Sequence, residues 1–173
     1  MTRKKSREIL VSIAMGSDSD ATVMAEAVNI LREFEIPHEV YLTSAHRAPE
    51  RTTDFARGAA GRGVKIIIAG AGAAAHLAGV IASQTPLPVI GVPIDATPLG
   101  GMDALLSTVQ MPGGIPVATM AIGKGGAKNA ALMAVRILAL EDRELRKKLD
   151  AYIEKLASDV ERKHENLTTL QET

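Results

Sequence analysis

The sequence predicts an α/β fold, a doubly wound parallel sheet of the flavodoxin-like or Rossmann-like type. Apolar segments of five or six residues, typical of buried strands, alternate along the chain with helical patterns of ten or more residues. Because parallel strands need long crossover connections, this alternation favours a parallel sheet with right-handed crossovers.

The first half of the chain supplies three strands, each followed by a helix. The expected strands span residues 9–15, 38–43 and 64–69, and the expected helices span residues 20–34, 49–62 and 73–83. Pro49 suits the first turn of a helix, since the N–H that proline lacks has no intrahelical partner there.

The second half continues the alternation. Strands are expected at residues 88–92 and 116–122, a loop with a short helix at residues 99–111, and a helix at residues 128–140. No repeat or linker interrupts the sequence. We therefore expect a single α/β domain over residues 1–173, with its core at residues 8–140.

Residues 142–168 differ in composition and predict an extended C-terminal helix. The segment is densely charged, and its apolar residues recur at spacings of three and four: Leu145, Leu149, Tyr152, Ile153, Leu156 and Val160. Such a narrow stripe is typical of a helix seam. We interpret it as an arm that packs on another subunit of a homo-oligomer; the alternative is a helix that folds back on its own domain.

Composition excludes several classes of protein. No apolar run reaches the ~18 residues of a membrane span, and no signal-peptide pattern is present. The absence of cysteine excludes a disulfide framework, a thiolate metal site and a cysteine nucleophile, and it fits a cytoplasmic location. The net charge is zero, so nothing indicates nucleic acid as a partner.

Candidate loops follow the strands and should converge on one edge of the sheet, where doubly wound folds bind ligands. They span residues 16–20, 44–49, 70–76, 94–101 and 123–126. In the first loop, Gly16 permits close approach of a ligand, Ser17 and Ser19 offer hydroxyls, and Asp20 can cap the helix or hold ribose hydroxyls. A strand that feeds a helix through such a turn favours a phosphate; an ordinary capped turn is the alternative.

The second loop carries the residues best suited to catalysis. His46 titrates near neutrality and so suits proton transfer, and Arg47 beside it can hold a phosphate through two hydrogen bonds. The alternative is a histidine that only caps or satisfies the core. No two histidines have metal-binding spacing, so we expect no metal site.

The third loop is a wall of small residues, which admits either a flat ring or a closely packed helix. His76 follows this wall and is a second candidate for the pocket. His38, after Pro37, is expected to be structural, and His164 to be solvated.

Five motifs together resemble the class I 5-(carboxyamino)imidazole ribonucleotide mutase family of purine biosynthesis, also called the catalytic subunit of phosphoribosylaminoimidazole carboxylase. They read M-G-S-D-S-D, S-A-H-R-A-P, I-I-A-G-A-G-A-A-A-H-L, L-P-V-I-G-V-P and L-L-S-T-V-Q-M-P-G-G-I-P-V-A-T-M-A-I-G, and cover about residues 9–140. The resemblance implies a flavodoxin-like three-layer fold, a homo-octamer and no metal or organic cofactor. The implied reaction moves a carboxylate from the exocyclic nitrogen of an aminoimidazole ribonucleotide to ring carbon 4.

By the same resemblance, the family's general acid/base histidine falls on His46. Its nucleotide-binding serine, aspartate and arginine fall on Ser17, Asp20 and Arg47, and its pocket walls fall on Ser44, Ala45, Ala71, Gly72, His76 and Leu77. Two positions depart from the family pattern. Ala73 replaces the usual glycine and would be strained at a positive φ, and Ala78 replaces the usual proline, removing a fixed φ from a loop near the site.

The residues fit this chemistry, since one histidine can protonate the departing nitrogen and later remove the ring proton. Three alternatives remain at this point. One is a non-catalytic binder of phosphorylated nucleotides, and another is a flavin-binding electron carrier, which the scarcity of aromatic residues disfavours. The third is a carboxylase that uses free carbon dioxide directly.

Overall fold

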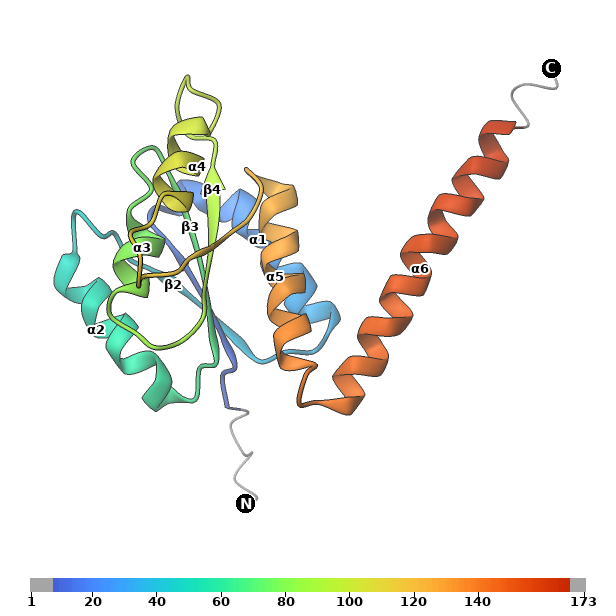
Figure 1. Cartoon of the computed structure of the whole chain (residues 1–173), viewed down its shortest axis with the longest axis horizontal. Helices are drawn as coiled ribbons and strands as arrows, with labels where there is room; N and C mark the ends of the chain where they lie inside the picture. Colours follow the sequence, from blue (N-terminus) through green and yellow to red (C-terminus); the bar gives the residue numbers. More distant parts are fainter. Residues whose placement is uncertain (1–7, 169–173) are drawn as a thin grey trace. The chain divides into compact units, whose positions relative to one another are not determined.

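The computed structural model describes residues 8–168, and a five-stranded parallel sheet lies at its centre (Figure 1). The sheet order is β2-β1-β3-β4-β5. The strands are β1 (Val11–Met15), β2 (His38–Leu42), β3 (Ile66–Gly72), β4 (Val89–Ile94) and β5 (Ala118–Thr119). This order is the flavodoxin-like one, in which the direction of winding reverses between β1 and β3. The predicted fold class is confirmed.

Helices cover both faces of the sheet, which makes the predicted three layers (Figure 1). The helices are α1 (Ala21–Glu33), α2 (Pro49–Ala59), α3 (Leu77–Ala82), α4 (Met102–Val109), α5 (Lys124–Leu138) and α6 (Arg143–Thr168), with two short 3-10 turns, η1 (Asp18–Asp20) and η2 (Ala60–Arg62). Helices α2 and α3 lie on one face, and α1 and the first part of α5 on the other. The described residues up to Ala134 form one compact unit, and those from Val135 form a second.

Burial of the central strands explains their composition. All five residues of β1 are buried, and the isoleucines of β3 are fully buried, because helices pack on both of their faces. Gly70 leaves room for the side chain of Met24 on α1, which would have to shift if this position carried a Cβ. The sheet edge is different: β2 keeps Val40 and Leu42 about half exposed.

Four elements differ most from the sequence prediction: β3, α3, β5 and α5. Helix α3 begins at Leu77 and not at residue 73, because residues 73–75 form a turn in which Ala73 and Ala75 have positive φ. Strand β3 continues through Gly72 because β4 pairs with it that far, with Gly72 opposite Ile94. Strand β5 has two residues instead of the seven predicted at 116–122, because this edge segment pairs with β4 only at Ala118 and Thr119. Helix α5 begins at Lys124 and not at residue 128, so the expected loop at 123–126 is largely helical.

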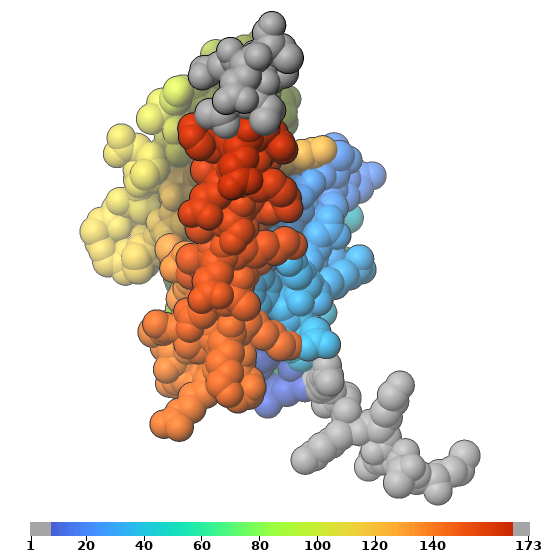
Figure 2. All heavy atoms as spheres, turned by 90° about the vertical axis from the view of Figure 1, so that its right-hand side faces the viewer, coloured from blue at the N-terminus to red at the C-terminus, as the bar shows by residue number. Residues whose placement is uncertain are grey.

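The second unit contains the predicted C-terminal helix α6, drawn in orange to red in Figure 2. Asp142 caps this helix: its Oδ1 accepts hydrogen bonds from the backbone N–H groups of Glu144 (2.9 Å) and Leu145 (3.0 Å). Ile153, Leu156 and Val160 are at least 41% exposed. Between residues 8 and 168, no helix is both long and apolar enough to cross a membrane.

Candidate active site

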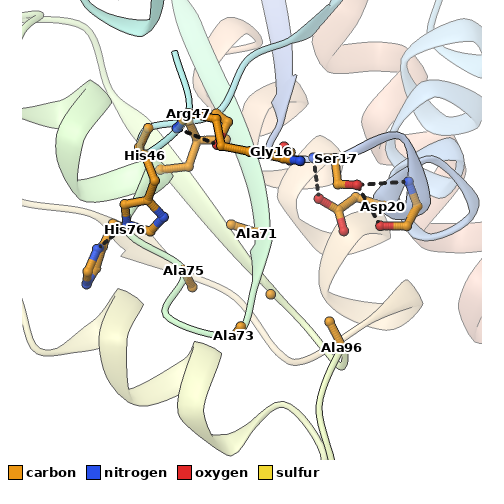
Figure 3. Close-up of a pocket in the computed structure, with 15 residues that line it drawn as sticks. Gly16, Ser17, Asp20, His46, Arg47, Ala71, Ala73, Ala75, His76 and Ala96 are labelled. Carbon is orange, nitrogen blue, oxygen red and sulfur yellow. Dashed lines mark hydrogen bonds between the residues drawn. The ribbon is translucent and has the colours of Figure 1, made fainter. Parts of the chain in front are cut away.

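A pocket of about 310 Å³ opens at the carboxyl ends of the central strands (Figure 3). Loops that follow β1, β2, β3 and β4 line it, as expected for a doubly wound sheet near the reversal of strand order. Every residue predicted for the site lines this pocket: Ser17, Ser19, Asp20, Ser44, Ala45, His46, Arg47, Ala71, Gly72, His76 and Leu77.

The turn after β1 is held by reciprocal hydrogen bonds between Ser17 and Asp20. The Ser17 backbone N–H donates to Asp20 Oδ2 (3.0 Å), and the Asp20 N–H donates to the Ser17 carbonyl (3.2 Å). Ser17 Oγ also accepts from the Ser19 N–H (3.3 Å). This is a capping box at the start of η1. Asp20 therefore takes part in the capping box of η1, whereas its side chain makes no cap hydrogen bond to α1, the helix that it was expected to cap. Ser17 and Ser19 of this turn line the pocket.

Asp20 is a buried carboxylate at the edge of the pocket, with 5% of its surface exposed. Burial raises the pKa of Asp20 above its usual 3.8, since a charged carboxylate is poorly solvated there. Hydrogen bonds from the backbone N–H groups of Ser17 and Gly16 act in the opposite direction and only partly offset the burial.

The loop after β2 delivers His46 and Arg47 to the pocket. Helix α2 begins at Pro49, as predicted, and the Ala48 N–H donates to the Ser44 carbonyl (2.9 Å), which turns the chain toward the helix. Arg47 joins this loop to the first one, because its Nη2 donates to the Gly16 carbonyl (3.1 Å). The guanidinium therefore lies beside the serine turn.

His46 and His76 form a direct pair, although they are thirty residues apart in sequence. His46 Nε2 lies 2.6 Å from His76 Nδ1, and the two rings meet edge to face at an interplanar angle of 80°. At this distance one nitrogen donates a hydrogen and the other accepts it. Figure 3 shows the histidines on one side of the pocket and Ser17 and Asp20 on the other.

The loop after β3 forms a wall of methyl groups and backbone between these two sides (Figure 3). Its turn is closed by a hydrogen bond from the Ala75 N–H to the Gly72 carbonyl (3.0 Å). Ala73 has φ +53° and Ala75 has φ +44°, so both occupy the left-handed region that favours glycine. The strain expected for Ala73 is therefore present.

Ala78 was expected to lie in a loop near the site, but it lies in a helix. It is the second residue of α3 and is buried. Because the first helical turn tolerates proline as well as other residues, the alanine leaves the geometry of this turn intact.

Ala73 and Ala75 also line the pocket and belong to the predicted wall of small residues, whereas Ala96 was not singled out from the sequence. Ala96 belongs to the loop after β4, which was a candidate because it follows a strand. An alanine side chain has no functional group that would single it out as a site residue. The loop at 123–126 contributes no lining residue, contrary to expectation, because it is largely taken up by the start of α5.

His38 lies outside the pocket, where its Nδ1 contacts the Ile36 carbonyl at 2.7 Å. This contact agrees with its expected structural role. No group of three or more potential metal-ligating side chains occurs among residues 8–168.

Comparison with known proteins gives a consistent result. The sequence model of the family described as AIR carboxylase matches residues 10–159. A protein from Pyrococcus horikoshii named N5-carboxyaminoimidazole ribonucleotide mutase is 56% identical over 94% of this chain and 91% of its own length. One of the same name from Mycobacterium leprae is 54% identical over 93% of each chain.

Solved structures agree with the sequence relatives. The crystal structure of Treponema denticola PurE matches with a TM-score of 0.79 and 30% identity, over 88% of this chain and 94% of that one. A PurE2 variant from the same organism matches with a TM-score of 0.81 and 28% identity, over the same shares of the two chains. The chain belongs to the AIR carboxylase family.

Proposed function

We propose that the protein is a mutase of purine biosynthesis that converts 5-(carboxyamino)imidazole ribonucleotide to 4-carboxy-5-aminoimidazole ribonucleotide. The names of relatives at 54–56% identity over nearly the whole chain support this reaction. The structural observation that carries it is the placement of His46, paired with His76, across one pocket from the Ser17–Asp20 turn and Arg47.

In this proposal the nucleotide is held by its charged and hydroxylated end. Ser17, Ser19 and Arg47 bind the phosphate, because hydroxyls and a guanidinium at a strand-to-helix turn suit an anion. Asp20 accepts hydrogen bonds from ribose hydroxyls. The aminoimidazole ring then lies against the alanine wall and reaches the histidine pair.

The proposed chemistry needs one proton that is given and then recovered. His46 donates a proton to the exocyclic nitrogen, the bond from this nitrogen to the carboxylate breaks, and carbon dioxide and a neutral amine form. Ring carbon 4 then attacks the carbon dioxide, and His46 takes up the proton that this carbon loses. Atoms and charge balance, so no redox partner enters the reaction.

His76 is the positioning residue in this scheme. Its Nδ1 shares a hydrogen with His46 Nε2, which fixes the orientation of the His46 ring. The alanine wall helps in a different way: it offers the released carbon dioxide an apolar surface and leaves little room for competing water.

We also propose that the protein works as a homo-octamer in the cytoplasm. Exposed apolar residues support assembly, since Met102, Leu106 and Val109 follow one another at helical spacing on α4 and are each about half exposed. The absence of cysteine fits a reducing compartment.

The test is an assay of the purified protein with the N-carboxylated nucleotide, carrying ¹³C in its carboxylate, without ATP or added metal. The expected product is the carbon-carboxylated isomer, with the label retained when unlabelled bicarbonate is scarce. A free-carbon-dioxide carboxylase would instead need added bicarbonate, and a non-catalytic binder would give no product. Either result would contradict the proposal.

A further inference from the structure

We infer that Asp18 competes with the ligand's phosphate for the same hydrogen-bond donors. In the free protein, the Asp18 carboxylate occupies the donors that the phosphate uses. The inference rests on the proposed function, since it concerns affinity at the proposed phosphate turn. It assigns a role to a residue that the mechanism above does not use.

The contacts of Asp18 are the first evidence. Its Oδ1 accepts a hydrogen bond from the Ser17 hydroxyl (3.1 Å) and another from the Ser19 backbone N–H (3.1 Å). Both serines line the pocket. One oxygen of a carboxylate therefore engages both a hydroxyl and an N–H of the turn, as a phosphate oxygen would.

The two carboxylates of this turn differ in how they are held. Asp20 is buried and completes the capping box with Ser17, so it is part of the frame of the turn. Asp18 is exposed, and an exposed side chain can change rotamer without breaking the fold. Asp18 is thus the carboxylate that can leave when a ligand arrives.

A place to receive the displaced carboxylate lies next to the pocket. A second hollow of about 360 Å³ is lined by Asp18 together with Arg47 and Arg51. Arg51 is held over the ring of Tyr41, with its guanidinium carbon 4.9 Å from the ring centroid. The guanidinium groups of Arg47 and Arg51 line the hollow that would receive the displaced carboxylate, and their positive charge would lower the free energy of that state.

The consequence is a weaker hold on the phosphate than the turn alone would give. The phosphate has to displace the Asp18 carboxylate from the hydrogen-bond donors of the turn. After it is displaced, Asp18 remains close enough to repel the phosphate. Removal of the charge at position 18 should therefore tighten the binding of any phosphomonoester at this turn and slow its release.

The test compares the affinity of Asp18→Asn and wild-type protein for ribose 5-phosphate by calorimetry. Asparagine keeps an acceptor oxygen but removes the charge. We expect binding to tighten about threefold to tenfold near 10 mM salt, as follows from removing one charge about 6 Å from a phosphate in aqueous surroundings. The gain should shrink in about 1 M salt, which screens the repulsion.

Asp54→Asn is the matched control. Asp54 is exposed on α2 and lines neither hollow, so the substitution makes the same change in net charge away from the turn. Its affinity should equal that of wild type. Binding by Asp18→Asn that is equal to or weaker than that of Asp54→Asn would overturn the inference.

The experiment also separates this inference from the proposed function. Equal, measurable affinities of the wild-type and Asp18→Asn proteins contradict the role of Asp18 alone. Failure of both proteins to bind ribose 5-phosphate contradicts the phosphate turn itself, and with it the proposed function.

Discussion

Asp20 combines two demands that conflict energetically. Its carboxylate accepts a hydrogen bond from the Ser17 N–H and, in the proposed function, binds ribose hydroxyls, yet it is buried beside the end of β1. Burial without an opposite charge destabilises the ionised form. We therefore expect the ionised Asp20 carboxylate to lower the stability of the fold at neutral pH.

The stability of the protein should therefore depend on the protonation of Asp20. Because burial raises the folded-state pKa of Asp20 above 3.8, the folded protein binds a proton more readily than the unfolded chain. Protonation of Asp20 therefore stabilises the folded protein. This stabilisation is complete below pH 3.8 and is lost as the pH rises through the folded-state pKa.

Asp20→Asn should therefore have a higher free energy of unfolding than wild type at pH 7. The difference should shrink as the pH falls toward 3.8. Urea denaturation followed by circular dichroism at several pH values checks this. A constant difference across the range would show that burial of the charge is not its cause.

At the residue scale, sequence reasoning selected the polar members of the site. Ser17, Asp20, His46 and Arg47 follow strands, and their chemistry is visible in the sequence. The contact between His46 and His76 was not predictable, because it depends on the approach of two loops thirty residues apart in sequence. Ala96 gave no chemical signal.

At the scale of the element, the turn at residues 72–75 departs furthest from local preference. The Ala75 N–H donates to the Gly72 carbonyl and closes this turn, and its first central residue, Ala73, has a positive φ, which favours glycine. Alanine there is less stable than glycine by about 1 kcal/mol or more. Sequence comparison with the family suggested this strain; only the dihedral angle establishes it.

Ala73→Gly should raise the free energy of unfolding by about 1 kcal/mol, which corresponds to about 2–4 °C in Tm for a chain of this size. Ala74→Gly is the matched control, since it makes the same chemical change one residue along, where φ is not positive. It should lower the stability by up to about 1 kcal/mol through added backbone entropy in the unfolded chain. Calorimetry measures the Tm of both variants. Equal changes in Tm relative to wild type would refute the strain at position 73.

Element boundaries were less predictable than element types. Each predicted helix and strand exists, but β3 runs three residues further, because its partner β4 continues to pair with it. The early start of α5 at Lys124 is not visible locally, since Gly125 and Gly126 disfavour a helix. Gly126 is there for packing: a Cβ would collide with the Ala121 carbonyl.

At the scale of the whole molecule, the alternation of strands and helices was sufficient to predict a parallel sheet. The strand order itself did not follow from periodicity, and came only from resemblance to a family. Exposed apolar residues occur in groups on α4 and on β2. Such groups fit the proposed contacts with further copies of the chain.

Leu106→Lys should weaken the proposed octamer. The side chain is 50% exposed, so lysine is tolerated by the subunit but would place a charge in an apolar contact. Sedimentation velocity should show smaller species than for wild type. Glu33→Lys, an exposed change on α1, serves as control and should leave the assembly unchanged. An intact octamer of Leu106→Lys would remove α4 from the interface.

The most direct measurement is the turnover of His46→Asn with the N-carboxylated nucleotide, together with its affinity for aminoimidazole ribonucleotide. The phosphate turn does not involve His46, so affinity should stay within about threefold of wild type. Turnover should fall by about a hundredfold or more, as expected when a general acid/base is removed. Turnover at the wild-type rate would contradict the account.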